Sequence, residues 1–406
     1  MQPSPLAPSH FATLASIDGV TLATASCGMK YVGRDDVMLI TCADGSSISG
    51  VFTTSDTAAA PVLWCQQHLH SATAIITNAG NANAFTGANG VKDVLEICTN
   101  LADRIGTKPE HILMASTGVI GEPLDIKCLI NSFDNLLEPS GKASWATAAD
   151  AIRTTDTFAK GASASCIIDD KVVHISGIAK GSGMIAPNMA TMLGYVATDA
   201  AISPALLDDI LADANHRSFN AITVDSDMST NDSVFLIATG AAGNKPISDP
   251  TQPDYQAFRD ALDKVMQELA QQIVRDGEGA SKFITIDIHG AESQETAHHI
   301  GMTIANSPLV KTAIAGEDAN WGRIVMAVGK SGANINQNQI AISIGGIHIT
   351  KDGARCEDYD EAPVAAHMQG ENIDISVHVG DGSGHARIWT CDLTHGYISI
   401  NADYRS

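Results

Sequence analysis

One threonine stands where a glycine-rich loop becomes an apolar run, in the stretch KGSGMIAPNMATMLGYVATDA over residues 180–200. A threonine hydroxyl is a weak nucleophile at neutral pH and needs a base beside it. The α-amine of Thr191 suits that task, because an α-amino group has a pKa of about 7.7–8.0. That amine is free only after the bond between Ala190 and Thr191 is broken. The pattern therefore raises the hypothesis of self-cleavage followed by nucleophilic catalysis.

Self-cleavage would need a loop that adopts unusual backbone conformations. Gly181 and Gly183 supply that freedom. The hydroxyl would attack the carbonyl carbon of Ala190, and water would hydrolyse the resulting ester. The same residue types are also compatible with a threonine that caps a helix or ends a strand, so the spacing alone leaves both interpretations open.

Other patterns that could carry chemistry fail on inspection. The glycines at 380, 382 and 384 precede a strand pattern, whereas a dinucleotide loop requires a helix there. The stretch DSDMSTND over residues 225–232 has Thr230 in place of the calcium-loop glycine and no closing Glu, so we interpret it as a polar turn. No zinc spacing accompanies His68 and His70 or His298 and His299. The sequence predicts neither a metal nor a cofactor.

Composition limits the partners. The 406 residues carry 46 acidic and 24 basic side chains, a formal net charge of −22. Such a charge disfavours nucleic acid and anionic membranes. No Lys or Arg precedes Lys30, and no run of 18 apolar residues occurs. The 8 cysteines include no C-x-x-C pair, which indicates reduced core thiols. Together these features predict a soluble, cytoplasmic protein.

Hydrophobic periodicity predicts the elements that must position these residues. Alternation indicates two strands over 35–54 around Asp44-Gly45, a hairpin around Asp169-Asp170 and a second hairpin joining IDISVHV to ARIWTCDL. Helical spacing indicates helices over 91–101, 143–153, 204–214 and 254–274. We expect a layered α/β protein with an N-terminal domain over 1–200, a helix-containing middle domain over 201–280 and a strand-rich C-terminal domain over 281–406.

Several long, ordered motifs resemble one enzyme family. They are GVFTT (50–54), NAGNANAFTG (78–87), STGVIG (116–121), TTDT (154–157), KGSGMIAPNMATML (180–193), RDGEGASKF (275–283), GEDANWGRI (316–324) and INADYRS (400–406). The likeness is to the ornithine acetyltransferases, also called glutamate N-acetyltransferases of arginine biosynthesis. It runs nearly end to end.

The resemblance implies a fold, a maturation step and a reaction. The fold would be an αββα sandwich of the self-processing kind. The chain would cut itself between Ala190 and Thr191, giving pieces 1–190 and 191–406. Thr191 would then take an acetyl group from N-acetylornithine and pass it to glutamate. Acetyl-coenzyme A is a further candidate donor, and the two pieces would stay associated, with two copies of each in the assembly.

The resemblance also assigns roles to individual residues. Thr117 and Gly118 would stabilise the oxyanion. The substrate-binding positions would be Thr154, Lys180, Thr191, Glu278, Asn401 and Ser406. Lys180 suits substrates that carry carboxylates, and Glu278 suits an ammonium group or proton transfer. The last of the six departs from the family, which usually ends in Thr.

One rival interpretation is a self-processing aminopeptidase or amidohydrolase of the same fold, which typically has Ser at the cleavage point. A second is a non-catalytic binding protein that keeps the fold and stays uncut.

Overall fold

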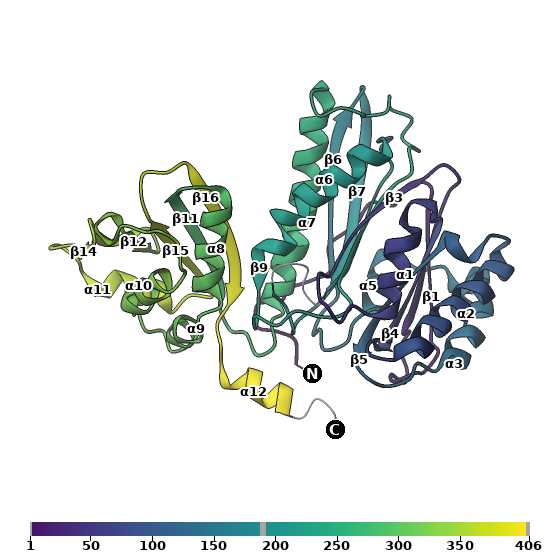
Figure 1. Cartoon of the computed structure of the whole chain (residues 1–406), viewed down its shortest axis with the longest axis horizontal. Coiled ribbons are helices and arrows are strands. Elements are labelled where there is room, and N and C mark those ends of the chain that lie inside the picture. Colours follow the sequence, from purple (N-terminus) through teal and green to yellow (C-terminus); the bar gives the residue numbers. More distant parts are fainter. Residues whose placement is uncertain (1, 187–191, 403–406) are drawn as a thin grey trace.

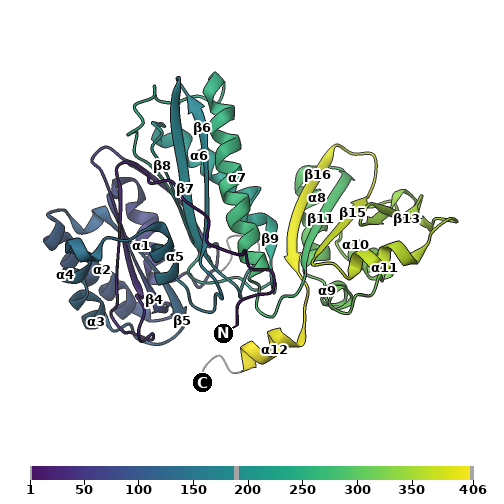
Figure 2. The same cartoon turned by 180° about the vertical axis from the view of Figure 1, so that it is seen from behind.

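The computed structural model describes residues 2–186 and 192–402, so Ala190, Thr191 and Ser406 lie outside the described residues. The chain forms a large lobe, built from most of the first 280 residues, and a smaller C-terminal lobe beside it (Figure 1). Helix α12 (His395–Ala402) leaves the small lobe and runs below the junction of the two lobes towards the large one, as both views show (Figures 1 and 2).

The first sheet of the large lobe has four strands in the order β1-β2-β4-β5. These are β1 (Val20–Ala25), β2 (Val37–Cys42), β4 (Ala74–Asn81) and β5 (Ile112–Val119). Only the β4–β5 pair is parallel. Its outer face is covered by α2 (Gly87–Ile105), α3 (Ile126–Asn131) and α4 (Phe133–Leu137), while α1 (Ala60–His68) lies along β5.

The second sheet has five strands in the order β3-β10-β8-β7-β6. These are β3 (Ser47–Phe52), β10 (Ser233–Ala238), β8 (Leu193–Thr198), β7 (Lys171–Lys180) and β6 (Lys160–Ile168). Its outer face carries α6 (Pro204–His216) and α7 (Pro253–Arg275). Helix α5 (Trp145–Ala151) closes one edge of the space between the sheets, against β1, β6 and β7.

Strand β8 shows why the two sheets stack. Leu193, Tyr195 and Ala197 belong to the core between the sheets, whereas Val196 belongs to the core under α6 and α7. Side chains alternate across a strand, so a strand covered on both faces must be apolar throughout. The Tyr195 hydroxyl reaches across to Thr77 of β4 at 2.7 Å. The result is an αββα sandwich, which confirms the predicted fold class.

The two strands predicted around Asp44-Gly45 exist but do not pair with each other. β2 pairs with β1 and β4, whereas β3 pairs with β10 in the other sheet. The hairpin at Asp169 and Asp170 is confirmed, and both residues adopt positive φ, at 51° and 60°. That conformation is the one tight hairpin turns demand.

The small lobe contains a seven-stranded sheet in the order β14-β13-β12-β15-β11-β16-β9. The strands are β9 (Ile222–Thr223), β11 (Phe283–Ala291), β12 (Ala341–Ile344), β13 (Ile347–Lys351), β14 (Ala354–Arg355), β15 (Asn372–His378) and β16 (Gly384–Cys391). The helices of this lobe are α8 (Gln294–Ala305), α9 (Pro308–Ala315), α10 (Trp321–Gly329) and α11 (Glu361–Met368). The predicted strand-rich C-terminal region is confirmed, and these helices are an addition to it.

The hairpin predicted between IDISVHV and ARIWTCDL is wrong. β11 lies between β15 and β16, parallel to the first and antiparallel to the second. The connection crosses the end of β11, where a Cβ atom on Gly290 would stand 1.8 Å from the Gly380 carbonyl oxygen. An alternating pattern identifies a strand but not its neighbour, so a local turn was the wrong inference.

Residues 201–280, expected as a middle domain, share the second sheet with earlier residues. β10 pairs with both β3 and β8, and α6 and α7 cover that same sheet. β9, from the same segment, joins the sheet of the small lobe through β16. Within the part of the chain that the structure describes, no helix is long and apolar enough to cross a membrane.

Candidate active site

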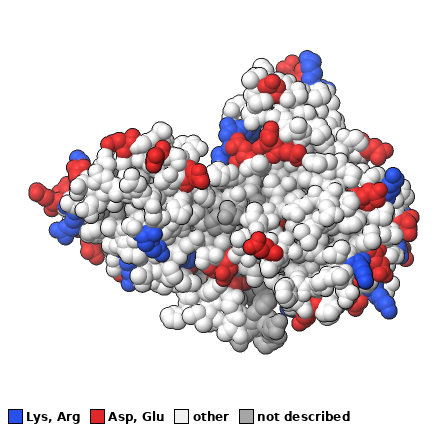
Figure 3. All heavy atoms as spheres, in the orientation of Figure 1, with Lys and Arg blue, Asp and Glu red and all other residues white. Residues whose placement is uncertain are grey.

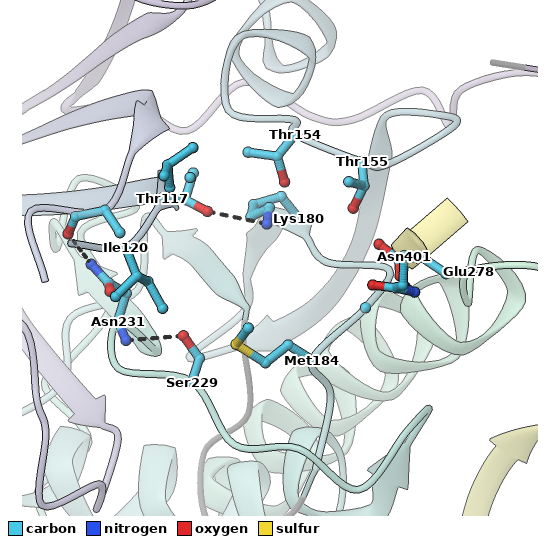
Figure 4. A pocket seen from close by; sticks show the side chains of 14 residues that line it. Thr117, Ile120, Thr154, Thr155, Lys180, Met184, Ser229, Asn231, Glu278 and Asn401 are labelled. Atoms are coloured by element: carbon cyan, nitrogen blue, oxygen red, sulfur yellow. Dashed lines mark hydrogen bonds between the residues drawn. The ribbon is translucent and has the colours of Figure 1, made fainter. Parts of the chain in front are cut away.

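A cavity of about 260 Å³ opens where the two sheets of the large lobe meet the loop after α7 and helix α12. Its polar lining comes from six parts of the chain: the end of β5, the loop after α5, the end of β7, residues 229–231, Glu278 in the loop after α7 and Asn401 on α12 (Figure 4). Topology, rather than sequence proximity, assembles this cavity.

Thr117 and Gly118 lie at the end of β5, where it pairs with β4. Gly118 has φ of 137°, a region that disfavours side chains. A Cβ atom there would stand 2.2 Å from the carbonyl carbon of Gly80. The backbones of β4 and β5 therefore approach so closely that only glycine fits at position 118.

Lys180 ends β7 and projects into the cavity towards Thr117 (Figure 4). Its Nζ atom donates a hydrogen bond to Thr117 Oγ1 at 3.2 Å, and its side chain is buried. Burial lowers the pKa of Lys180, while the carboxylates of Asp156, Asp232 and Glu278 oppose that shift. A buried ammonium group is costly unless it is paired, so an anionic ligand that enters the cavity would gain a strong interaction with Lys180.

Asp156 connects the two loops that lie beside Lys180, one after α5 and one after β7. One carboxylate oxygen accepts from the Gly181 amide at 2.6 Å and the other from the Thr154 amide at 3.1 Å. Lys160 donates to Asp156 at 2.7 Å and to Asp276, just beyond α7, at 2.6 Å. The Lys160 charge holds the pKa of Asp156 below its ordinary value despite burial, and burial raises the pKa of Asp276.

Glu278 and Asn401 form the opposite side of the cavity. Asn401, on α12, donates to Glu278 Oε2 at 2.7 Å. The Glu278 amide donates to the Ser182 carbonyl at 2.9 Å, which ties the loop after α7 to the loop after β7. The C-terminal helix therefore folds back over the cavity, as a role for Asn401 requires.

The cavity brings together six of the predicted site residues: Thr117, Gly118, Thr154, Lys180, Glu278 and Asn401. The predicted nucleophile and cleavage site, Thr191 and Ala190, lie outside the described residues, as does Ser406. The described chain resumes at Met192, and the next residue, Leu193, pairs with Lys180 across the β7–β8 ladder.

Comparison with known proteins decides the family. The model of the ArgJ family matches residues 21–406. The chain belongs to the ArgJ family. It is 50% identical over 405 residues to the arginine biosynthesis bifunctional protein ArgJ of Zymomonas mobilis, covering 99% of both chains. It is also 50% identical over 395 residues to the ArgJ protein of Gluconobacter oxydans, covering 97% of this chain and 93% of that one.

A solved ArgJ structure matches about half of the chain. The crystal structure of the arginine biosynthesis bifunctional protein from Bacillus halodurans superposes with a TM-score of 0.51 and 43% identity. The match covers 99% of that chain but 52% of this one.

Some residues that line the cavity of this ArgJ-family chain were not predicted from the sequence. Ser229 and Asn231 line it, although residues 225–232 were interpreted as a polar turn. Asn231 Nδ2 donates to the carbonyl oxygens of Ala82 at 2.6 Å and Ser116 at 3.0 Å. This side chain therefore joins the loop before β10 to the first sheet. Thr155 and Met184 were missed as well, and only their adjacency to Thr154 and Gly183 could have signalled them.

The remaining candidate groups lie elsewhere. Among the described residues, no cluster of three or more His, Cys, Asp or Glu side chains could hold a metal ion. All eight cysteines are described and free. Burial raises the pKa of the Cys42 and Cys65 thiols to about 12, so neither is a nucleophile near neutral pH.

The buried ion network behind this site should contribute strongly to stability. Lys160, Asp156 and Asp276 have side chains that are fully buried. Replacing Lys160 by Met would leave two carboxylates facing each other in the core, so we expect Lys160→Met to lower the free energy of unfolding by about 3–5 kcal/mol. Urea denaturation measures this loss.

Lys245→Met is the matched control. Lys245 also pairs with an aspartate, Asp169, at 3.2 Å, but its side chain is 85% exposed. We expect a change below about 1 kcal/mol. Equal losses for the two variants would contradict the role given to burial.

Proposed function

We propose that this ArgJ-family chain is an acetyltransferase of arginine biosynthesis that moves an acetyl group from N-acetylornithine to glutamate. The observation that carries the proposal is the convergence of a buried cation, Lys180, and a buried carboxylate, Glu278, on one cavity beside Thr117 and Gly118. Amino-acid substrates present a carboxylate and an ammonium group, which those two charges complement.

The proposed chemistry is ping-pong acyl transfer. The Thr191 hydroxyl attacks the acetyl carbonyl of N-acetylornithine, ornithine leaves, and glutamate then takes the acetyl group from the Thr191 ester. Each step passes through a tetrahedral oxyanion. Thr117, through its hydroxyl, and Gly118, through its backbone N–H, are the proposed donors to that oxygen. Lys180 would bind the substrate carboxylate, with Thr154 nearby, and Asn401 would bind the substrate from the opposite side, next to Glu278.

The proposed nucleophile requires the chain to cut itself between Ala190 and Thr191. One supporting observation is that the solved ArgJ chain from Bacillus halodurans corresponds to 52% of this chain. A piece spanning 191–406 would have that size. A second is that β8, which begins at Leu193, is a buried strand that would anchor the new terminus.

Finer assignments belong to the same proposal. Acetyl-coenzyme A would serve as a second donor, in keeping with the word bifunctional in the names of the relatives. The cut pieces would remain associated, with two copies of each, in the cytoplasm. The acidic surface supports small-molecule rather than nucleic-acid partners: acidic side chains are spread over both lobes of the face in Figure 3, and the formal net charge is −22.

An assay with two donors tests the function. Purified protein is given radiolabelled glutamate with either N-acetylornithine or acetyl-coenzyme A, and N-acetylglutamate is quantified. We expect product from N-acetylornithine, and product from both donors if the enzyme is bifunctional. Release of free acetate or of amino acids as the dominant reaction would favour the hydrolase alternative. Denaturing electrophoresis of the same sample should show two pieces in place of a single 42.3 kDa chain.

A further inference from the structure

Gly183 packs directly against the carboxyl group of Glu278, and both residues line the cavity. A Cβ atom on Gly183 would stand 2.4 Å from the carboxyl carbon of Glu278 and 2.5 and 2.6 Å from its two oxygens. Gly183 is not among the glycines with positive φ, so left-handed backbone strain does not require a glycine here. The space that the Glu278 carboxyl group occupies is what requires it.

The main chain around Gly183 is held on both sides. On one side, the Gly181 amide donates to the Asp156 carboxylate at 2.6 Å. On the other side, the Met184 amide donates to the Asp225 carboxylate at 2.6 Å. These carboxylates come from two other segments, the loop after α5 and the loop between β9 and β10. The backbone at position 183 therefore has little freedom to move away from Glu278.

The main chain of Glu278 is held as well. Its amide donates to the Ser182 carbonyl at 2.9 Å. The next residue, Gly279, has φ of 75° and lies so close to α12 that a Cβ atom there would stand 2.4 Å from the Tyr397 nitrogen. Because both backbones are fixed, the Glu278 side chain is the part that would yield to an atom added at Gly183.

A small displacement of this carboxyl group would change the site without unfolding it. Carbon atoms in contact lie at least about 3.5 Å apart, so the Glu278 carboxyl carbon would have to move by about 1 Å from the added atom, which would stand at 2.4 Å. Its oxygen Oε2 accepts from Asn401 at 2.7 Å (Figure 4), and a shift of this size weakens such a bond. Gly183 therefore determines where the carboxylate lies rather than whether the chain folds.

The chemistry of the proposed donor indicates which ligand group needs this carboxylate. The α-nitrogen of N-acetylornithine is an uncharged amide, so its one cationic group is the side-chain amine, which is protonated at neutral pH like that of lysine. Glutamate has no such group. The buried carboxylate of Glu278 can form a charge-assisted hydrogen bond with the side-chain ammonium, and such bonds depend on position.

We propose that Gly183 is a positioning residue for donor selection: the space it leaves lets the Glu278 carboxylate lie where it meets the side-chain ammonium of N-acetylornithine. This inference rests on the proposed function and deepens it. It assigns Glu278 to the half-reaction of the donor, and it leaves the half-reaction of glutamate independent of the contact between Gly183 and Glu278.

Gly183→Ala in the full-length chain tests this role. In a ping-pong reaction the kcat/KM of each substrate reports only its own half-reaction. We expect kcat/KM for N-acetylornithine to fall by about 10- to 100-fold, and kcat/KM for glutamate to stay near its wild-type value. The preference for N-acetylornithine over N-acetylnorvaline, which lacks the side-chain ammonium, should fall by the same factor. Equal losses for donor and acceptor, or an unchanged preference, would overturn the proposal.

A second substitution separates this role from a structural one. Glu278→Asp withdraws the carboxyl group by one carbon–carbon bond, about 1.5 Å, which clears the position of the added Cβ atom. Adding Gly183→Ala to Glu278→Asp should therefore cost little further activity, although Glu278→Asp is itself slower than wild type. If the losses of the two single variants multiply in the double variant, the two positions act independently and the proposal is wrong.

Gly329→Ala is the matched control, because a Cβ atom at Gly329 meets no atom within 4 Å. We expect wild-type kinetics from it. The Gly183→Ala chain should be cut and melt like wild type, and failure to fold or to be cut would assign Gly183 to the loop itself and overturn the proposal. Wild-type protein without acetyl transfer would remove the proposed function, whereas an active wild type whose Gly183→Ala variant treats both substrates alike removes this inference alone.

Discussion

Thr191→Ala should give a single uncut 42.3 kDa chain without acetyltransferase activity. The substitution removes the only oxygen proposed to attack the Ala190 carbonyl and, later, the acetyl group. We expect loss of activity on the order of 10⁴-fold or more, the scale seen when a nucleophile is removed from an enzyme that works by covalent catalysis. Denaturing electrophoresis and the N-acetylornithine assay measure the two effects on one preparation.

Thr191→Ser is the control for this experiment. It keeps a hydroxyl on the Cβ atom, so we expect two pieces on the gel and measurable transfer. Normal cleavage in the Ala variant would show that another residue is the nucleophile. Uncut but active Ala protein would separate catalysis from maturation and contradict the ping-pong scheme.

Gly118→Ala should abolish most of the activity for a steric reason. The added Cβ atom would stand 2.2 Å from the Gly80 carbonyl carbon, at a backbone φ of 137° that alanine disfavours. The end of β5 must then move away from β4, and the proposed oxyanion donors move with it. We expect kcat to fall by about 100-fold or more, with a stability loss of about 1–3 kcal/mol.

Gly121→Ala is the control that separates the effect of the steric clash on kcat from the effect of backbone strain. Gly121 follows on the same turn and also has positive φ, 85°, but a Cβ atom there meets no atom within 4 Å. We expect a stability loss of about 1 kcal/mol and nearly unchanged kcat. Similar loss of kcat in both glycine variants would contradict a specific role for the β4–β5 contact.

Local patterns predicted the elements of this fold better than their partners. The apolar stripe of α7 and the apolar run of β8 were evident, because each reflects burial of that element. The pairing of β15 and β16 was wrong, since β11 enters between them from a distant part of the chain. Neither could the sequence reveal that β2 and β3 belong to different sheets.

The candidate site shows a similar division. Thr117, Lys180 and Glu278 were predicted through resemblance, and the fold places them around one cavity. Asp156 was not predicted, because its contacts with Thr154 and Gly181 join two separate loops. Residues 225–232 were interpreted as a polar turn, because their spacing was compared only with that of a calcium-binding loop. Polar side chains that form hydrogen bonds with the backbone of distant segments follow no recognisable spacing in the sequence.

Strand order in the second sheet has a consequence for the unfolding of a cut molecule. β8 and β10 follow position 191, whereas β3 on one side and β7 and β6 on the other precede it. The two pieces are thus interleaved within a single sheet and cannot separate as rigid bodies. Once unfolded they become two independent chains, so renaturation turns into a second-order reaction. The melting temperature of the mature form should therefore rise more steeply with protein concentration than that of an intact chain.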